Sequence, residues 1–518
     1  MQVKKVIRKK ILEKILGTIV LSGLFFLLYK LLIPRITAFG CFDDCFNFMG
    51  GYFLLHGDKL YSEIFYNHAP LMAYISMVIQ AVTHPQNLYE LILRHRQFVL
   101  LFGLFAELLL FFRFGKKIIV FALLYELTKW YVFGDRFLAE GLIVYPLVYM
   151  LGIIFDKKPT SGDAIIAGIC TWFILFMREP YILTALVLYA AVLWKIRRVV
   201  WQSVLLFIVI SLATILFFNV HEFFYNVWTI NLASVAGENA RTHIFGLDFY
   251  RVFFYPFLIL LKNPWSFFGQ IEFLITFVFV TISFYFIWKK FFVKILFIWI
   301  LLACTSLRYY PPGVPYYGAF HVLPWYALLT ASTVFLLSYV WRENKKIVAS
   351  LSLVLIGVVF FILFSKASYT HDRIDQQTEF ITNYGNVLQV GNVVAALSTP
   401  KNTLFLDGFD DIIYFVAHRY SHYPYSWYTS LMPSYRKYTN ARLAMFAKDP
   451  PDFYYGSCPK QQNPNYLLPN FIKGEYERLY NLTHPSCLWV KKSVFIKISK
   501  EQWKKAAESL YFATPTNI

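Results

Sequence analysis

The sequence predicts a mainly α-helical membrane protein: a multi-pass bundle of transmembrane helices followed by a small α/β domain. Three observations support this fold class. The chain of 518 residues is 58% hydrophobic and only 15% charged, whereas about a quarter of the residues of a soluble domain are charged. Apolar stretches of membrane-spanning length recur over residues 1–365, which makes the bilayer the solvent. Residues 366–518 are much more polar.

Eleven spans are predicted, and several are shorter than the ~20 residues that cross a bilayer as a helix. The first follows a basic segment and lacks a small-residue cleavage pattern, so it is predicted to be retained. Residues 70–83 are too few for a span and are predicted to form an interfacial helix on the outer surface. The eleven spans lie at residues 14–34, 97–112, 117–133, 137–155, 163–177, 181–194, 202–219, 270–288, 291–306, 321–340 and 347–365.

Basic residues predict the orientation of these spans. With the N-terminus in the cytoplasm, every short connection on the inside carries lysine or arginine, as the positive-inside rule requires. The inside connections contain Arg113, Lys116 and Lys117, then Lys157 and Lys158, then Lys195, Arg197 and Arg198, then Lys289 and Lys290, and finally Arg342, Lys345 and Lys346. The net charge of +19 is thereby explained without a nucleic-acid partner. The protein is predicted to lie in the cell membrane.

Residues 366–518 are predicted to form an extracytoplasmic domain of α/β type. Residues 403–407, 466–468 and 493–498 are strand candidates, and residues 411–418 are a helix candidate.

The six cysteines do not follow a metal-binding spacing. Cys41 with Cys45, and Cys458 with Cys487, either form disulfides in an oxidising compartment or remain free thiols.

The predicted first outer loop, residues 35–96, opens with two adjacent carboxylates, Asp43 and Asp44. Charge beside hydrocarbon is costly and is normally retained for function; an ordinary solvated loop is the alternative interpretation. Gly57 follows Asp43 by fourteen residues. The runs Leu-Tyr-Ser-Glu, ending at Glu63, and Asn-His-Ala-Pro-Leu, beginning at Asn67, come next.

This order of residues resembles the first outer loop of the polytopic glycosyltransferases of the C-type (GT-C) fold. Within that family it is similar to the branch of protein mannosyltransferases and aminoarabinose transferases. Asp43 takes the place of the acidic residue, Gly57 that of the glycine and Tyr61 that of the tyrosine. Glu63 replaces a later Asp, and Ala69-Pro70-Leu71 replaces Pro-Pro-Leu. The resemblance is strongest in this loop and extends loosely over the remaining spans.

The resemblance implies an inverting hexosyl- or pentosyltransferase. Its donor is a sugar on a polyprenyl phosphate in the bilayer, and its acceptor is an extracytoplasmic glycan, lipid or protein. A glycine-rich loop for a nucleotide donor is not found in the sequence. The attacking hydroxyl must lose its proton to a carboxylate within hydrogen-bond reach. Asp43 is the predicted catalytic base, and Asp44 either tunes its neighbour or takes the role itself.

Other residues of the outer loops are predicted to bind substrate, among them Glu63 and His68. Glu140 lies at the outer end of the fourth span. One hypothesis is a divalent metal ion held by Glu140 with Asp43 and Asp44, because hard cations take carboxylate oxygens. The other is a structural pair between Glu140 and Arg136.

The departing lipid phosphate requires positive charge, for which the arginine fork is well suited. The candidates at outer membrane ends are Arg94, Arg96, Arg178 and Arg308. Arg178 alternatively pairs with Glu179. His321 lies after Arg308 in a run that resembles a late segment of the family, and it is predicted to contact substrate.

Two other functions remain open at this stage. A flippase or transporter of lipid-linked saccharides would show paired halves and charges in mid-span. A half-repeat is not visible in the sequence, and acidic residues concentrate at one predicted membrane face, which favours the enzyme. A ligase or polymerase of lipid-linked glycans would also use the outer loops.

Overall fold

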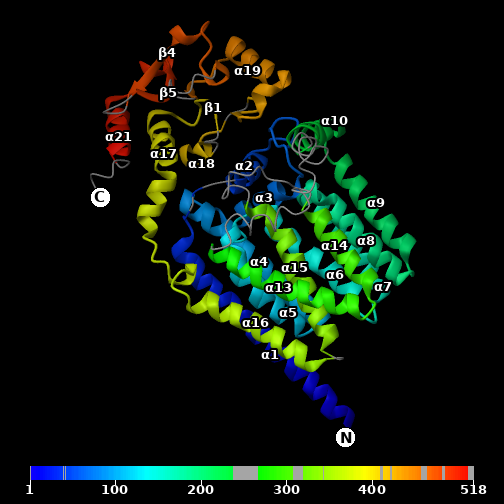
Figure 1. The fold of residues 1–518 in the computed structure, drawn as a ribbon. Helices are drawn as coiled ribbons and strands as arrows, with labels where there is room; N and C mark the ends of the chain where they lie inside the picture. The colour runs from blue at the N-terminus through cyan, green and yellow to red at the C-terminus, as the bar shows by residue number, and fades with distance from the viewer. Residues whose placement is uncertain are drawn as a thin grey trace, which may run out of the picture. The chain divides into compact units, whose positions relative to one another are not determined.

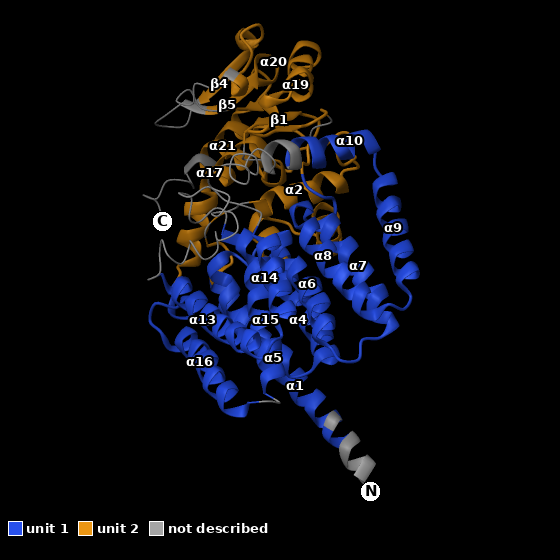
Figure 2. Cartoon of the chain, turned by 45° about the vertical axis from the view of Figure 1, so that its right-hand side comes forward, with its two compact units in different colours: residues 1–34, 68–71, 95–373 blue, residues 35–67, 72–94, 374–518 orange. Residues whose placement is uncertain are grey.

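The computed structural model describes residues 2–38, 40, 43–236, 266–306, 319–341, 344–408, 412–420, 423–456, 464–480 and 485–511. The chain divides into two compact units (Figure 2). Unit 1 comprises residues 1–34, 68–71 and 95–373, and unit 2 comprises residues 35–67, 72–94 and 374–518. By its contacts, most of the predicted first outer loop therefore belongs to the same unit as the C-terminal region.

Unit 1 is a bundle of helices (Figure 1). Each of the eleven stretches predicted as spans falls on one of them. In chain order they are α1 (Gln2–Leu32), α4 (Leu88–Phe114), α5 (Lys117–Thr128), α6 (Ala139–Phe155), α7 (Ser161–Met177), α8 (Ile182–Ile196), α9 (Val200–Leu216), α10 (Val220–Phe224), α13 (Phe267–Trp288), α14 (Phe292–Thr305), α15 (Leu323–Val340) and α16 (Lys345–Phe364). The helical form follows from the apolar stretches, since a helix satisfies its backbone polar groups internally.

Not all of these helices are long enough to cross a bilayer by themselves. In the described parts of the chain, six helices pass a test of length and apolar composition, and the bent pair Val200–Leu216 with Val220–Asn231 adds a seventh if it counts as one span. The helices α6, α7 and α14 have 17, 17 and 14 residues, fewer than the ~20 that a hydrocarbon core requires. The chain is a membrane protein, and the number of eleven spans stays a prediction.

Helix α15 lies in the interior of unit 1. Of its most apolar 18-residue window, 94% is buried, compared with 33% for α1 and 28% for α16. It packs against α5, α6, α13 and α14. Helices α1 and α16 therefore present much of their apolar surface to the surroundings, as expected of helices that face lipid.

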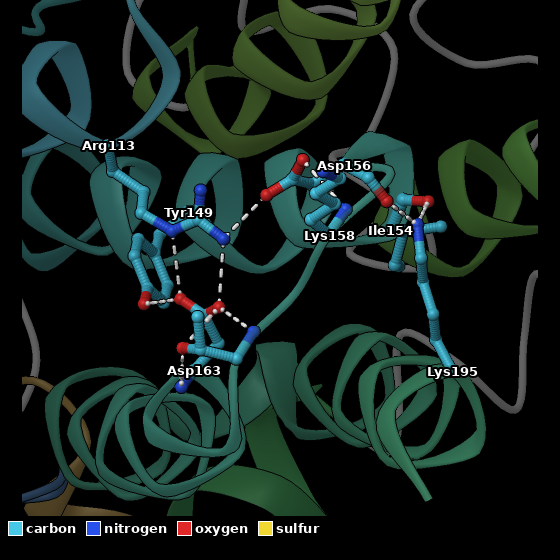
Figure 3. A network of polar contacts seen from close by, with 8 residues as sticks. Arg113, Tyr149, Ile154, Asp156, Lys158, Asp163 and Lys195 are labelled. Atoms are coloured by element: carbon cyan, nitrogen blue, oxygen red, sulfur yellow. Dashed lines mark hydrogen bonds and ion pairs between the residues drawn. The ribbon is translucent and has the colours of Figure 1, made fainter.

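A polar network ties α4, α6, α7 and α8 together at one end of the bundle (Figure 3). Arg113 donates to both carboxylate oxygens of Asp163, at 3.0 and 2.8 Å, and its Nη2 lies 2.6 Å from Asp156 Oδ2. Tyr149 also donates to Asp163, at 2.8 Å. Lys195 donates to the main-chain oxygens of Ile154 and Asp156. This network lies at the end of the bundle to which the positive-inside rule assigns the cytoplasm.

Unit 2 combines helices with a mixed five-stranded sheet. Its helices are α2 (Asp43–Leu55), α3 (Leu71–Thr83), α17 (Gln376–Leu397), α18 (Ile413–Ala417), α19 (Arg436–Lys448), α20 (Lys492–Phe495) and α21 (Lys500–Tyr511). The strands are β1 (Leu404–Asp407), β2 (Trp427–Tyr428), β3 (Phe453–Tyr455), β4 (Tyr476–Tyr480) and β5 (Pro485–Lys491), in the order β2-β1-β3-β5-β4. Strand β1 is parallel to β2 and β3, and β5 is antiparallel to β3 and β4.

The strand predicted at residues 403–407 is confirmed as β1, which is buried along its whole length. The two other strand candidates are wrong. Residues 466–468 do not form a strand. Pro464–Tyr466 is a 3-10 turn, and the irregular chain after it reaches Pro469, which lacks the N–H needed for strand pairing. In residues 493–498 the apolar residues alternate without being buried on one face: Ile496 is 80% exposed, and the chain after β5 turns into α20. The helix predicted at residues 411–418 is confirmed over α18, and Asp411 lies outside the described residues.

Aromatic side chains hold the first outer loop against the C-terminal segment within unit 2. The Phe53 ring of α2 lies 5.0 Å from Trp427 and 5.4 Å from Tyr414, edge to face. The main-chain N–H of Tyr425 donates to the main-chain oxygen of Glu63 at 2.7 Å. Such ring pairs add stability beyond the area that they bury. Two segments more than 300 residues apart in sequence thus share one core.

The cysteines divide into two groups. Cys45 and Cys487 each take part in a disulfide, and Cys170 and Cys304 are free thiols. Cys41 and Cys458, the partners that the sequence suggests, lie outside the described residues.

Candidate functional site

Four of the residues predicted to bind substrate converge in unit 1. They are His68, in the segment before α3; Glu140, in the first turn of α6; Arg178, which caps the end of α7; and His321, in the turn before α15. They are separated by tens to more than a hundred residues along the chain, so local structure brings no two of them together. They meet because α6 packs against both α7 and α15.

Proline residues place three of these side chains at helix ends. Arg178 has extended backbone angles, φ −155° and ψ 96°, because Pro180 two residues later prevents α7 from continuing. His321 lies two residues before α15, whose second residue is Pro324, a position at which proline starts helices. His68 precedes Pro70, at the start of α3.

Glu140 accepts two hydrogen bonds on one carboxylate oxygen. Arg178 Nε and His321 Nδ1 each lie 2.9 Å from Glu140 Oε1. The side chains of Glu140 and Arg178 are 1% and 5% exposed, so the pair is shielded from water on nearly every side. Because a carboxylate only accepts, His321 carries a proton on Nδ1. Glu140 thereby fixes the orientation of the His321 imidazole.

Arg178 also contacts His68. Its Nη1 lies 2.7 Å from His68 Nδ1, and Asn231 Nδ2 lies 3.2 Å from the same ring nitrogen. A guanidinium has only donors, so Nδ1 of His68 accepts and the imidazole proton lies on Nε2. The ion-pair distance from His68 Nδ1 to Glu179 Oε1 is longer, 3.6 Å. With Nδ1 accepting from Arg178, His68 has Nε2–H as its donor.

Glu179 and Asn231 complete the network, and sequence reasoning assigned neither to the site. Glu179 Oε2 accepts from the main-chain N–H of Ala69 at 3.1 Å, and its Oε1 accepts from Asn231 Nδ2. Arg178 donates to Glu140 and contacts His68; the alternative prediction of a pair between Arg178 and Glu179 stays a prediction. Asn231 belongs to a π-helical segment, η4 (Tyr225–Ala236), and such segments are frequent at functional sites.

The network lies at the opposite end of α6 and α7 from the Arg113 network. Sixteen residues separate Glu140 from Asp156 along α6, about 24 Å at 1.5 Å per residue. This distance approaches the ~30 Å of a hydrocarbon core. The two polar networks of unit 1 are thus spaced like the two faces of a membrane.

A buried guanidinium beside two imidazoles can bind an anion or donate to hydroxyl groups. Arginine matches phosphate oxygens with its fork of N–H groups, and low exposure strengthens its field. Glu140 balances the charge of Arg178, so the site is stable without a ligand.

The hypothesis of a divalent metal ion held by Glu140 with Asp43 and Asp44 stays a prediction. At Glu140, Oε1 already accepts from Arg178 and His321, and the neighbouring guanidinium opposes a cation. Within the described ranges, no group of three or more His, Cys, Asp or Glu side chains has a metal-binding arrangement.

Of the remaining predicted residues, Arg96 belongs to unit 1 and is fully buried. Asp43, Asp44, Glu63 and Arg94 belong to unit 2. Asp43 and Asp44 are the first two residues of α2, where carboxylates are stabilised by the helix dipole. Asp44 is fully buried, and its Oδ1 accepts from the main-chain N–H of Cys45 at 3.2 Å. Glu63 accepts from the main-chain N–H of Lys59 at 2.7 Å, which closes a turn. Arg94 is exposed. Arg308 lies outside the described residues.

A second buried charged cluster was also missed. Lys129 Nζ lies 2.6 Å from Glu126 Oε2, with both side chains fully buried, and Tyr145 donates to Glu126 Oε1 at 2.9 Å. Glu107 of α4 is fully buried as well. The signal was present in the sequence, because charged residues inside an apolar stretch are costly and mark special positions.

Comparisons with known proteins place the fold beside one solved structure. No protein-family model matches the chain, and no curated protein matches it in sequence. The crystal structure of ArnT from Cupriavidus metallidurans, bound to undecaprenyl phosphate, is similar with a TM-score of 0.48 and 12% identity. The match covers 78% of this chain and 84% of that one.

Proposed function

We propose that this protein is a membrane glycosyltransferase that moves one sugar from a polyprenyl-phosphate donor to an extracytoplasmic acceptor. The observation that carries the proposal is the convergence of His68, Glu140, Arg178 and His321 in one buried network at one end of the bundle. The sequence predicts each of these four residues to bind substrate, for several different reasons. If each had an unrelated structural role, the four would have no reason to lie in contact.

The charges of the network suit a lipid phosphate. The donor's phosphate lies at the membrane surface, and Arg178 with the Nε2–H of His68 would bind its oxygens. These contacts strengthen as the phosphate takes up negative charge, so they stabilise the transition state more than the ground state. In this scheme Glu140 and His321 hold the guanidinium in place.

The proposed reaction is a single displacement at the anomeric carbon. The acceptor hydroxyl attacks, the bond between the anomeric carbon and the phosphate oxygen breaks, and its electron pair leaves with the polyprenyl phosphate. Asp43 is the proposed base for the hydroxyl proton, a role that rests on the resemblance of the first outer loop. One displacement inverts the configuration of the sugar.

The proposal is tested by transfer of labelled sugar from a polyprenyl-phosphate donor in reconstituted liposomes, together with transbilayer movement of the donor. We expect Asp43→Asn to reduce turnover by about 10²–10⁴-fold, because a positioned general base contributes that much. Asp44→Asn should be milder if Asp44 only tunes its neighbour.

Asp372→Asn, which alters an exposed carboxylate of unit 1, is the matched control and should retain full turnover. Full transfer by Asp43→Asn would remove Asp43 from the mechanism. Movement of the donor across the bilayer without any transfer, in the unmutated protein, would identify a transporter and refute the proposed function.

A further inference from the structure

A cavity of about 340 Å³ lies between α5, α15 and α16, away from the proposed active site. Nine of its fourteen lining residues are aliphatic, and the others are two lysines, two serines and one tryptophan. The lining residues are Lys116, Lys117, Val120, Leu123, Leu124, Val334, Leu337, Ser338, Trp341, Val348, Ser352, Leu355, Ile356 and Val359. Its volume falls within the range of sites for small ligands.

The cavity opens towards the surroundings of the bundle. Val120, Ile356 and Trp341, which line it, are 42%, 50% and 49% exposed. In a membrane these side chains would face lipid, so a ligand could reach the cavity from within the bilayer. A tryptophan at such an edge is typical of the membrane interface.

The length of the cavity matches one leaflet. Along α16 it runs from Val348 to Val359, a separation of eleven residues or about 16 Å at 1.5 Å per residue. Half of a hydrocarbon core is ~15 Å. One acyl chain of a phospholipid spans that depth, whereas a polyprenyl chain is far longer than the wall.

Positive charge gathers at one end of the cavity only. Lys116 and Lys117 lie there, and the exposed Lys345 and Lys346 begin α16 at the same end. Lys116 Nζ lies 3.1 Å from Glu13 Oε1, and the two side chains are 70% and 39% exposed. An exposed pair of this kind is weak, so an anionic group can replace Glu13. Lys117 Nζ lies 5.2 Å from the centre of the Phe335 ring.

We propose that this cavity binds an acidic glycerophospholipid. One acyl chain lies between α5, α15 and α16, and the phosphate lies against Lys116 and Lys117. Basic pockets between transmembrane helices recognise anionic headgroups in this way. The positive-inside rule accounts for lysines at this face but not for an apolar cavity of one-leaflet length below them. The inference does not depend on the proposed transfer reaction.

The test is native mass spectrometry of the purified full chain, titrated with phosphatidylglycerol, phosphatidylcholine or undecaprenyl phosphate. The unmutated protein should bind phosphatidylglycerol more tightly than phosphatidylcholine. Lys116→Gln with Lys117→Gln should weaken phosphatidylglycerol binding about 30-fold, from the contribution of two lysines near an anionic lipid. The control, Lys157→Gln with Lys158→Gln, removes the same charge from exposed positions of another connection and should bind as the unmutated protein does.

Ser352→Trp fills part of the cavity without changing its charge and should weaken the binding of both phospholipids alike. Val359→Trp serves the same purpose if the first variant does not fold. Equal losses in the two lysine double variants would show a general effect of surface charge and overturn the proposal. A preference for undecaprenyl phosphate would overturn the assigned occupant. Unchanged binding in both tryptophan variants would remove the cavity from the explanation.

Discussion

Substitution of Arg178 by methionine tests the buried network directly. Methionine keeps an unbranched chain of similar length and removes the charge. In Arg178→Met, Glu140 would remain buried at 1% exposure without its cation, and His68 would lose the donor that lies 2.7 Å from its Nδ1. We expect a folded but clearly destabilised protein.

The magnitude follows from the contacts that are lost. Arg178 makes two hydrogen bonds within the network, to Glu140 and to His68, and hydrogen bonds to charged groups contribute ~1.5–3 kcal/mol each. Breaking a buried ion pair by removing one partner costs ~3–5 kcal/mol. Both estimates place the loss in the free energy of unfolding of Arg178→Met at about 3–5 kcal/mol.

The assay is reversible unfolding of the purified protein in mixed micelles, applied to a double-mutant cycle. Glu140→Gln removes the charge that Arg178→Met leaves unpaired, so the double variant should be more stable than the sum of the single effects by about 1–3 kcal/mol. Arg198→Met, at an exposed position, should change stability by less than ~0.5 kcal/mol. Additive effects in the cycle, or a loss for Arg178→Met as small as that of the control, would refute the buried pair.

Two further predictions concern unit 2 and the topology. A Cβ on Gly51 would lie 2.5 Å from Ser76 Oγ and 2.6 Å from the main-chain nitrogen of Met77, so Gly51→Ala should destabilise the protein by about 1–3 kcal/mol through overpacking. Gly23→Ala, where a Cβ would meet nothing within 4 Å, should leave the thermal unfolding temperature unchanged or slightly raised; equal effects would contradict the close approach of α2 and α3. A cysteine probe at position 460 should react with an impermeant reagent on intact cells, since the residues after Lys366 are predicted to lie outside. Reaction only after permeabilisation would invert the topology.

Helix positions followed well from the sequence, and strands followed poorly. An apolar run in lipid becomes a helix wherever it is long enough, because hydrogen bonds within the run are the only ones it has. Strand formation depends on partners elsewhere in the chain. The apolar alternation of residues 493–498 has no pairing strand, whereas β3 (Phe453–Tyr455) was not predicted and forms because β1 and β5 flank it.

The residues of the candidate site likewise divide into those that the sequence predicts and those that it does not. Arg178 was predicted as a positive residue at an outer membrane end, and His321 from a run that resembles a late segment of the family. Glu179 and Asn231 carry no such local signal. Asn231 belongs to the site only because η4 packs against the turn that holds Glu179.

Hydropathy, charge and proline act within one or two turns of the chain, so the class of the protein, the positions of its helices and the residue types at their ends follow from the sequence. The folded structure is needed to show that Glu140 bonds to Arg178 and His321 at the same oxygen, and that most of the predicted first outer loop shares a unit with the C-terminal region. Such contacts depend on which helix faces pack together, and that choice depends on the fit of side chains across the whole bundle rather than on any one segment.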